Sequence, residues 1–311
     1  MSDATAELLA LALDYAQMSG GAFDPTIEPL SALWDITSDT PHVPEADDIA
    51  RARALVDWTK VRLDGNTVTL DPGMGIDLGG IAKGSGMIHP NMATMLVFLT
   101  TDCAVSPEML QKALSTDVQE TFNMVSVDGD TSTNDMVAIL ANGLAGNAEI
   151  ASEGEDFENF MRALNTVTVH LCRCIAGDGE GATKLLECRV TGALDKAAAK
   201  TAARGVICSS LLKAAMFGAD ANWGRVLCAI GYSGAKVDIG KVGVAFRSRA
   251  GTVRVCEMGA GIPFSEEEAK AVLSEDEIEI LVSLGDGEAS AAAWGCDLTY
   301  DYVKINGDYR T

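Results

Sequence analysis

The chain has 311 residues, of which 48% are hydrophobic and 22% charged, a balance that predicts a globular protein with a sizeable core. Its formal net charge of -22 disfavours nucleic acid and anionic membranes as partners, because both would be repelled by this surface. No apolar run approaches the roughly 20 residues of a membrane-spanning helix, so we expect a cytoplasmic protein that does not contact a membrane.

The cysteines and histidines give no sign of a metal site. The eight cysteines contain no Cys-x-x-Cys pair, and the three histidines, His42, His89 and His170, are far apart in the sequence. A structural zinc site needs closely spaced pairs of such ligands. We therefore expect buried free thiols, no metal and no resident cofactor.

Residues 1–83 predict a small α+β fragment. An Ala- and Leu-rich helix comes first, a loop rich in glycine follows over 19–25, and a short helix covers 47–58. Two short apolar runs, 61–63 and 67–70, flank Asp64-Gly65-Asn66 and predict a β-hairpin.

From Thr94 onward, strands and helices alternate more regularly. The patterns predict a strand over 94–101, a helix over 106–120, a strand over 122–127, a helix ending near 142–143 after a polar loop, and a long helix over 157–175. Two Ala-rich helices follow Thr191, separated by Gly205, and the last residues predict strands over 242–246 and 252–258, a helix capped by Ser265, and strands over 278–283 and 298–305. The fold class is α/β with mixed or antiparallel sheets.

The run from Lys83 to Leu96 is the most informative segment for function. It is a glycine-rich loop, Lys-Gly-Ser-Gly, that continues through His89 to Ala93-Thr94 and then into an apolar strand. A threonine hydroxyl is a weak nucleophile, but cleavage before Thr94 would free an α-amine, with a pKa of roughly 7.7 to 8.0, to serve as its base. The alternative is that Thr94 is only the β-branched first residue of the strand.

The start of this run and two further glycine-containing segments each suggest a known type of site, and each also has a simple structural interpretation. Lys83-Gly84-Ser85 has the reverse of the residue order that a phosphate-binding P-loop needs, so that function is excluded. The loop from Asp128 to Asp135 lacks the central glycine and the final acid of a calcium loop, and a polar loop that caps a following helix is the better interpretation. Asp178-Gly179-Glu180-Gly181 is either an acidic turn or part of a site, and the two remain open.

Five blocks in the same order resemble the bifunctional ornithine acetyltransferase/glutamate N-acetyltransferase family of arginine biosynthesis, over residues 80–311. They are the runs 83–96, 128–135 and 177–184, then Asn222-Trp223-Gly224-Arg225, and the terminal segment 306–311. The resemblance implies a layered αββα sandwich and self-cleavage between Ala93 and Thr94. It also implies that the substrate is bound by Lys83, Thr94, Glu180, Asn306 and Thr311.

The same resemblance implies a reaction and its partners. Thr94 would take the acetyl group from N-acetylornithine as an ester and pass it to glutamate, and some family members also accept acetyl-CoA as the donor. The family further implies an assembly of cleaved chains. A lysine that pairs with a carboxylate and a glutamate that meets an amine suit such amino-acid substrates.

Residues 1–84 resemble a different family, the FAD:protein FMN transferases. The segments 19–26, Leu33-Trp34 and 77–84 carry this second resemblance. We therefore expect a flavin-transferase-like fragment over 1–83 and an acetyltransferase-like domain over 84–311. The acetyltransferase family uses a Thr-Gly pair upstream to hold the oxyanion, and residues 1–79 contain no such pair. Two alternatives to an active acetyltransferase follow: a flavin-transferase fragment, or a chimeric chain without activity.

Overall fold

The computed structural model describes residues 10, 12–14, 16–18, 49, 61–64, 67–70, 76–89, 95–131 and 134–308. The chain divides into two compact units. The smaller unit takes in 1–78, 101–109 and 141–152, and the larger unit takes in 79–100, 110–140 and 153–311. No described helix combines the length and the apolar character that crossing a membrane requires.

The smaller unit contains the hairpin that the sequence predicts. Strands β1 (Val61–Asp64) and β2 (Thr67–Leu70) pair antiparallel, with Asp64 opposite Thr67. The described positions among residues 10–18 are helical, as expected for the first helix. The loop predicted over 19–25 and all of the helix predicted over 47–58 except Ile49 lie outside the described residues.

A three-stranded sheet has the order β3-β4-β6, formed by β3 (Leu78–Lys83), β4 (Leu96–Thr101) and β6 (Met136–Ala141). The prediction of a helix ending near 142–143 is therefore wrong. Its apolar run joins the sheet edge, where the backbone N–H of Met136 donates to the carbonyl oxygen of Met95 at 2.9 Å. Between β4 and β6 the chain forms α4 (Pro107–Asp117), η3 (Phe122–Met124) and β5 (Val125–Ser126).

The larger unit is built on a seven-stranded mixed sheet of order β10-β9-β8-β11-β7-β12-β5. Besides β5, the sheet contains β7 (Leu185–Ala193), β8 (Gly243–Ser248), β9 (Gly251–Glu257), β10 (Ala260–Gly261), β11 (Glu277–Ser283) and β12 (Ala289–Cys296). The pairs β11–β7 and β12–β5 are parallel, whereas the other strand pairs are antiparallel. The prediction of an α/β fold with mixed sheets is confirmed.

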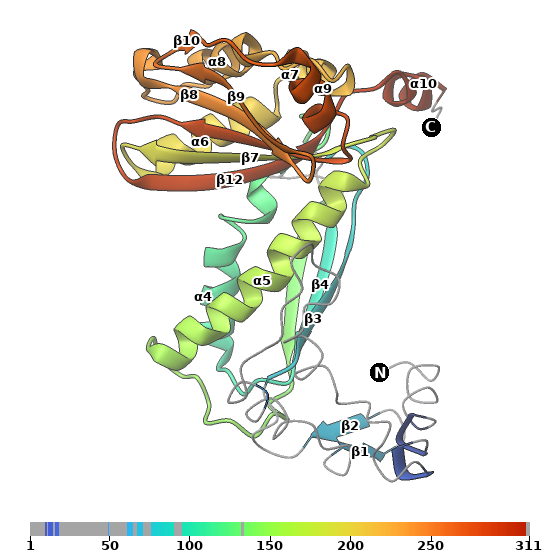
Figure 1. Ribbon diagram of the computed structural model, residues 1–311. Helices are drawn as coiled ribbons and strands as arrows, with labels where there is room; N and C mark the ends of the chain where they lie inside the picture. The colour runs from blue at the N-terminus through green and yellow to red at the C-terminus, as the bar shows by residue number, and fades with distance from the viewer. Residues whose placement is uncertain are drawn as a thin grey trace. The chain divides into compact units, whose positions relative to one another are not determined.

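The two faces of this sheet are covered differently (Figure 1). Helices α6 (Lys196–Ile207) and α9 (Glu266–Leu273) pack on one face, and α8 (Trp223–Tyr232) packs on α6. On the other face the long helix α5 (Glu155–Gly177) contacts β12 and β7. Alternate residues of β11 follow this division, since Ile278, Ile280 and Val282 are buried and the residues between them are more exposed.

The two Ala-rich helices are present, but they do not separate at Gly205. Helix α6 continues to Ile207, and α7 (Ser210–Phe217) begins after Ser209, whose hydroxyl accepts from the backbone N–H of Leu212. Gly205 instead lies where a Cβ would come within 2.5 Å of the Cβ of Ser233. The glycine allows α6 to approach the end of α8, and the break comes where a serine caps the next helix.

The prediction of a strand over 298–305 is also wrong. The strand lies earlier, as β12, and the chain then forms α10 (Tyr300–Asp308). The hydroxyl of Thr299 accepts from the backbone N–H of Tyr302 at 3.2 Å, a helix-capping contact that the alternation of apolar and polar residues does not reveal.

Candidate functional site

The glycine-rich loop after Lys83 is held by a carboxylate from a distant part of the sequence. Lys83 ends β3, and the loop then runs from Gly84 to Ile88. Asp128 accepts from the backbone N–H of Met87 at 2.7 Å and from that of Ile88 at 3.1 Å. Met87 has a φ of 55°, a conformation that non-glycine residues rarely adopt, so these two bonds support an unusual backbone.

The acidic turn at 178–181 packs against the same loop. The backbone N–H of Glu180 donates to the carbonyl oxygen of Ser85 at 2.8 Å, and the hydroxyl of Ser85 donates to the carbonyl oxygen of Asp178 at 3.0 Å. Gly86 faces the carboxylate of Glu180 closely enough that a Cβ would collide with it. The turn is therefore packed against the glycine-rich loop and is not an isolated surface bend.

Helix α10 brings a third segment to this place. The side-chain amide of Asn306 donates to Oε2 of Glu180 at 3.0 Å and to the carbonyl oxygen of Tyr302 at 3.0 Å. Two of the predicted substrate-binding residues, 126 positions apart, thus touch each other. Lys83, at the end of β3, is exposed, and its side chain makes no hydrogen bond or ion pair with the described residues. Ala93, Thr94 and Thr311 lie outside the described residues, so their predicted roles stay predictions.

The segment that contains Thr94 lies between two anchored positions. On its N-terminal side, Nδ1 of His89 lies 3.0 Å from the hydroxyl of Ser126, and Nε2 lies 2.9 Å from the guanidinium of Arg204. Burial, followed by the charge of Arg204, lowers the pKa of His89, which favours the neutral ring. On its C-terminal side, the backbone N–H of Met95 donates to Asp135 at 2.8 Å.

Sequence reasoning missed the contribution of Tyr302. Its hydroxyl donates to Oδ2 of Asp128 at 3.3 Å. Burial and the neighbouring Asp128 raise the pKa of Tyr302 to about 12, so the hydroxyl keeps its proton at neutral pH. Tyr302 and Asn306 are four residues apart on one helix face. That signal becomes visible only when the segment is recognised as a helix.

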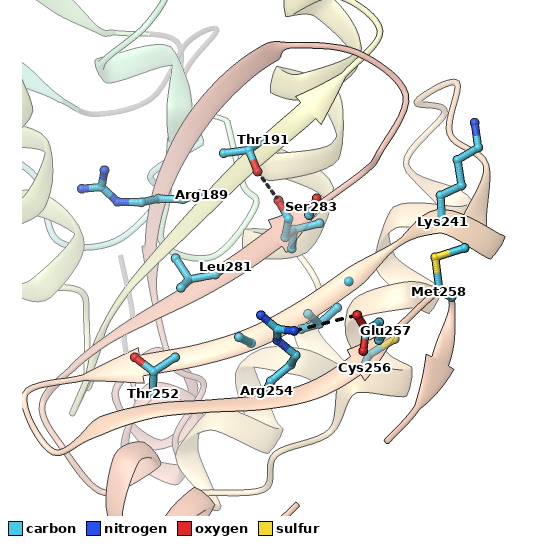
Figure 2. A pocket seen from close by; sticks show the side chains of 14 residues that line it. Arg189, Thr191, Lys241, Thr252, Arg254, Cys256, Glu257, Met258, Leu281 and Ser283 are labelled. Carbon is cyan, nitrogen blue, oxygen red and sulfur yellow. Dashed lines mark hydrogen bonds and ion pairs between the residues drawn. The ribbon is translucent and has the colours of Figure 1, made fainter. Parts of the chain in front are cut away.

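A separate cavity lies elsewhere, on the strands of the seven-stranded sheet. It has a volume of about 750 Å³, and Figure 2 shows Arg189, Leu281 and Arg254 among the side chains at its wall. None of its lining residues is a predicted site residue. A cavity of about 360 Å³ is lined instead by His89, Arg204 and Cys208. Among the described residues, no group of three His, Cys, Asp or Glu side chains is placed to hold a metal ion.

Comparison with known proteins gives consistent matches. The family model described as "ArgJ family" matches residues 32–311. The "Arginine biosynthesis bifunctional protein ArgJ 1" of Clostridium acetobutylicum is 54% identical over 236 residues, which are 76% of this chain and 58% of that protein. The "Arginine biosynthesis bifunctional protein ArgJ" of Thermotoga neapolitana is 51% identical over 266 residues, which are 85% of this chain and 67% of that protein.

A solved structure agrees with these matches. The crystal structure of the arginine biosynthesis bifunctional protein ArgJ from Bacillus halodurans superposes with a TM-score of 0.64 at 47% identity, covering 68% of this chain and 98% of that chain. The chain spans about 58 to 67% of the length of the two curated relatives above. The matched stretch begins at residue 32, well before the predicted start at residue 80. The chain belongs to the ArgJ family.

Proposed function

We propose that the chain is an N-acetyltransferase of arginine biosynthesis that moves an acetyl group from N-acetylornithine to glutamate. The observation that carries this proposal is the contact between Glu180 and Asn306 beside the loop that follows Lys83. Family membership supports it, because the relatives are named arginine biosynthesis bifunctional proteins.

The first step is self-cleavage. The hydroxyl oxygen of Thr94 attacks the carbonyl carbon of Ala93, and the peptide C–N bond breaks as an ester forms and the nitrogen takes up the proton. Water then hydrolyses the ester, which leaves a carboxylate on Ala93 and a free α-amine and hydroxyl on Thr94. The amine provides the base that an unassisted threonine lacks.

Acetyl transfer then follows in two halves. The Thr94 oxygen attacks the acetyl carbonyl of N-acetylornithine, its proton passes through the α-amine to the departing nitrogen, and ornithine leaves. The α-amine of glutamate attacks the resulting acetyl ester, which gives N-acetylglutamate and restores the hydroxyl. In this proposal Glu180 meets the substrate amine, and Lys83 and Asn306 bind its carboxylate and polar groups.

The solved relative is about as long as the segment that cleavage before Thr94 would release. The match takes in 68% of this chain and almost all, 98%, of the solved chain. The solved chain is therefore about a third shorter than this one. The segment from Thr94 to Thr311 has 218 of the 311 residues (311 minus 93), which is a similar share.

The test is denaturing intact-mass measurement followed by an acetyl-transfer assay. The wild-type chain of 32.5 kDa should yield two fragments, of 93 and 218 residues (311 minus 93), and form N-acetylglutamate from N-acetylornithine and glutamate. Thr94→Ala should stay uncut and inactive, whereas Thr94→Ser should retain some cleavage. Thr252→Ala, at an exposed threonine of β9, is the matched control and should behave as the wild type does. A wild-type chain that remains uncut and transfers no acetyl group would overturn the proposal.

The remaining features belong to the same proposal. We infer no resident cofactor, an assembly of cleaved chains, and a cytoplasmic location. Some family members also accept acetyl-CoA as the donor, and an acetyl-transfer assay with acetyl-CoA in place of N-acetylornithine decides whether this chain does. Domain boundaries at 83/84 and a flavin-transferase-like origin of residues 1–83 also stay proposals, carried by the segments 19–26 and 77–84. Flavin absorbance of the purified protein, with no acetyl transfer, would favour the flavin-binding alternative.

A further inference from the structure

Asp128 occupies a central position between two parts of the site. Its carboxylate accepts from the backbone N–H groups of Met87 and Ile88, at 2.7 and 3.1 Å, and from the hydroxyl of Tyr302, at 3.3 Å. The first two contacts lie in the loop that leads toward Thr94, and the third comes from α10. One side chain therefore joins the loop before the nucleophile to the C-terminal helix.

The same helix also reaches the substrate-binding carboxylate. Asn306, four residues after Tyr302, donates to Glu180, and the backbone of Glu180 bonds to Ser85 in the loop. These contacts form a closed ring. It runs from the loop to Asp128 and Tyr302, along α10 to Asn306, and through Glu180 back to the loop. Such a closed path fixes the position of each member more firmly than one bond would.

Gly181 shows how closely α10 is fitted to the turn. It has a φ of +67°, and a Cβ there would lie 2.6 Å from the backbone nitrogen of Tyr302. Its carbonyl oxygen accepts from the hydroxyl of Thr299 at 2.6 Å, just before α10. The beginning of the helix is fixed at Thr299, so the Tyr302 hydroxyl adds a second point that sets the orientation of the helix.

We propose that Asp128 is a positioning residue for the loop Gly84 to Ile88, which leads toward Thr94. We propose further that the Tyr302 hydroxyl couples the substrate-binding helix α10 to that loop through Asp128. This inference deepens the proposed function and rests on it. Asp128 acts on self-cleavage because it holds the backbone leading to the scissile bond. Tyr302 acts on substrate affinity because it holds the helix that carries Asn306.

The experiment compares Tyr302→Phe with Tyr300→Phe, and Asp128→Ala with Asp128→Asn. Tyr300 lies on the same helix, is 82% exposed, and contacts the Phe217 ring, which a phenylalanine would preserve. Tyr302→Phe should raise KM for N-acetylornithine and glutamate about 3- to 10-fold with kcat within about twofold, as expected for one lost hydrogen bond. Tyr300→Phe should leave both constants unchanged.

For Asp128, the expected order of self-cleavage rates is wild type, then Asn, then Ala. The Asn side chain keeps one oxygen that can accept from the loop, so it should recover part of the rate lost in Asp128→Ala, which we expect to be at least about 10-fold. Equal KM values for the two tyrosine variants, or wild-type cleavage in Asp128→Ala, would overturn the inference.

Amide hydrogen exchange separates this inference from the proposed function. In Asp128→Ala, the backbone amides of Met87 and Ile88 should exchange at least about 10-fold faster than in the wild type, whether or not the protein is active. Tyr302→Phe should increase their exchange to a smaller degree, and Tyr300→Phe should not. Unchanged exchange in Asp128→Ala overturns the inference, whereas an inactive wild type with this exchange pattern overturns only the proposed function.

Discussion

Gly86 and Gly181 should tolerate substitution by alanine to different degrees, because the added Cβ would clash with different kinds of atom. At Gly86 the opposing atoms belong to the flexible end of the Glu180 side chain. At Gly181 they belong to the backbone of Tyr302, and φ is +67°. One position can accommodate a methyl group by moving a carboxylate, and the other cannot.

We predict that Gly86→Ala changes the unfolding midpoint little but raises KM about 10-fold, which corresponds to about 1.4 kcal/mol, because Glu180 must leave Asn306. Gly181→Ala should lower the free energy of unfolding by at least about 1–2 kcal/mol. Thermal unfolding measures the stability of each variant, and steady-state kinetics measure its KM. Gly79→Ala, where no atom lies within 4 Å of the added Cβ, is the control. A large loss of stability in Gly86→Ala would contradict the prediction.

The charge of Glu180 should affect binding more than folding. Glu180→Gln keeps the shape of the side chain and an oxygen for Asn306, but it removes the negative charge that would meet a substrate amine. Because hydrogen bonds to charged groups contribute about 1.5–3 kcal/mol, KM for N-acetylornithine should rise on the order of 10- to 100-fold. Glu267→Gln, at an exposed position of α9, serves as the control. Unchanged KM in Glu180→Gln would remove this residue from the site.

The site was only partly predictable from the residues themselves. Glu180 and Asn306 came from the family resemblance, and their contact spans 126 positions of sequence. Asp128 lay within a resembling block, but its sequence suggested only a polar loop. No local pattern indicates that its carboxylate reaches Met87 and Tyr302, because long-range contacts depend on how β5 and α10 are brought together by the sheet.

At the scale of elements, the structure explains why Gly205 lies inside a helix. An added Cβ would meet the Cβ of Ser233 at 2.5 Å and the carbonyl oxygen of Ala229 at 3.3 Å. The helices α6 and α8 thus approach each other closely at this glycine. Helix propensity favours alanine there, whereas packing requires glycine.

We predict that Gly205→Ala lowers the free energy of unfolding by about 1–3 kcal/mol, the usual cost of overpacking. Ser233→Gly removes the opposing Cβ, so the double variant Gly205→Ala/Ser233→Gly should recover part of that loss. Gly231→Ala, in α8 with no atom within 4 Å of the added Cβ, should be neutral or stabilising by up to about 1 kcal/mol. Denaturant titration measures all four proteins. Additive losses in the double variant would show that the two helices do not interact through this pair.

Helices and strands that depend on turn residues, periodicity or caps within their own segment were predicted correctly. Those that depend on a neighbouring element were not. The hairpin β1–β2, the long helix α5 and the Ser265 cap of α9 follow from turn residues, periodicity and capping. The run 136–141 is short and apolar, so its sequence fits a helix or a strand. It forms the strand β6 because it pairs with the neighbouring strand β4. The segment 300–308 alternates like a strand, yet the cap at Thr299 starts a helix.

At the scale of the whole molecule, the high net negative charge makes the placement of the arginines important. Three of them, Arg173 of α5, Arg189 of β7 and Arg247 of β8, converge on glutamates of β7 and β11 across one sheet face. Glu279 lies at the centre, 2.9 Å from Nε of Arg247 and 3.0 Å from Nε of Arg189. This network joins four elements, α5, β7, β8 and β11, on the sheet face opposite α6 and α9.

The network predicts a specific dependence of stability on pH. The hydrogen bonds from Arg247, with the charges of Arg247, Arg189 and Arg173, hold the pKa of Glu279 below its ordinary value of 4.5, against the opposing effect of burial. A carboxylate whose pKa is lower in the folded state contributes stability above pH 4.5, and this stability is lost as the pH falls through the folded-state pKa.

Glu279→Gln should therefore lose less stability than the wild type between pH 6 and pH 3, as followed by urea denaturation midpoints. The difference should stay below about 1 kcal/mol, because the side chains of Glu279 and Arg247 are 27% and 45% exposed and water screens the pair. Added salt should reduce the difference further. Glu267→Gln, exposed on α9, should follow the wild-type pH dependence. If Glu279→Gln follows it as well, the arginines hold Glu279 in place without stabilising its charge.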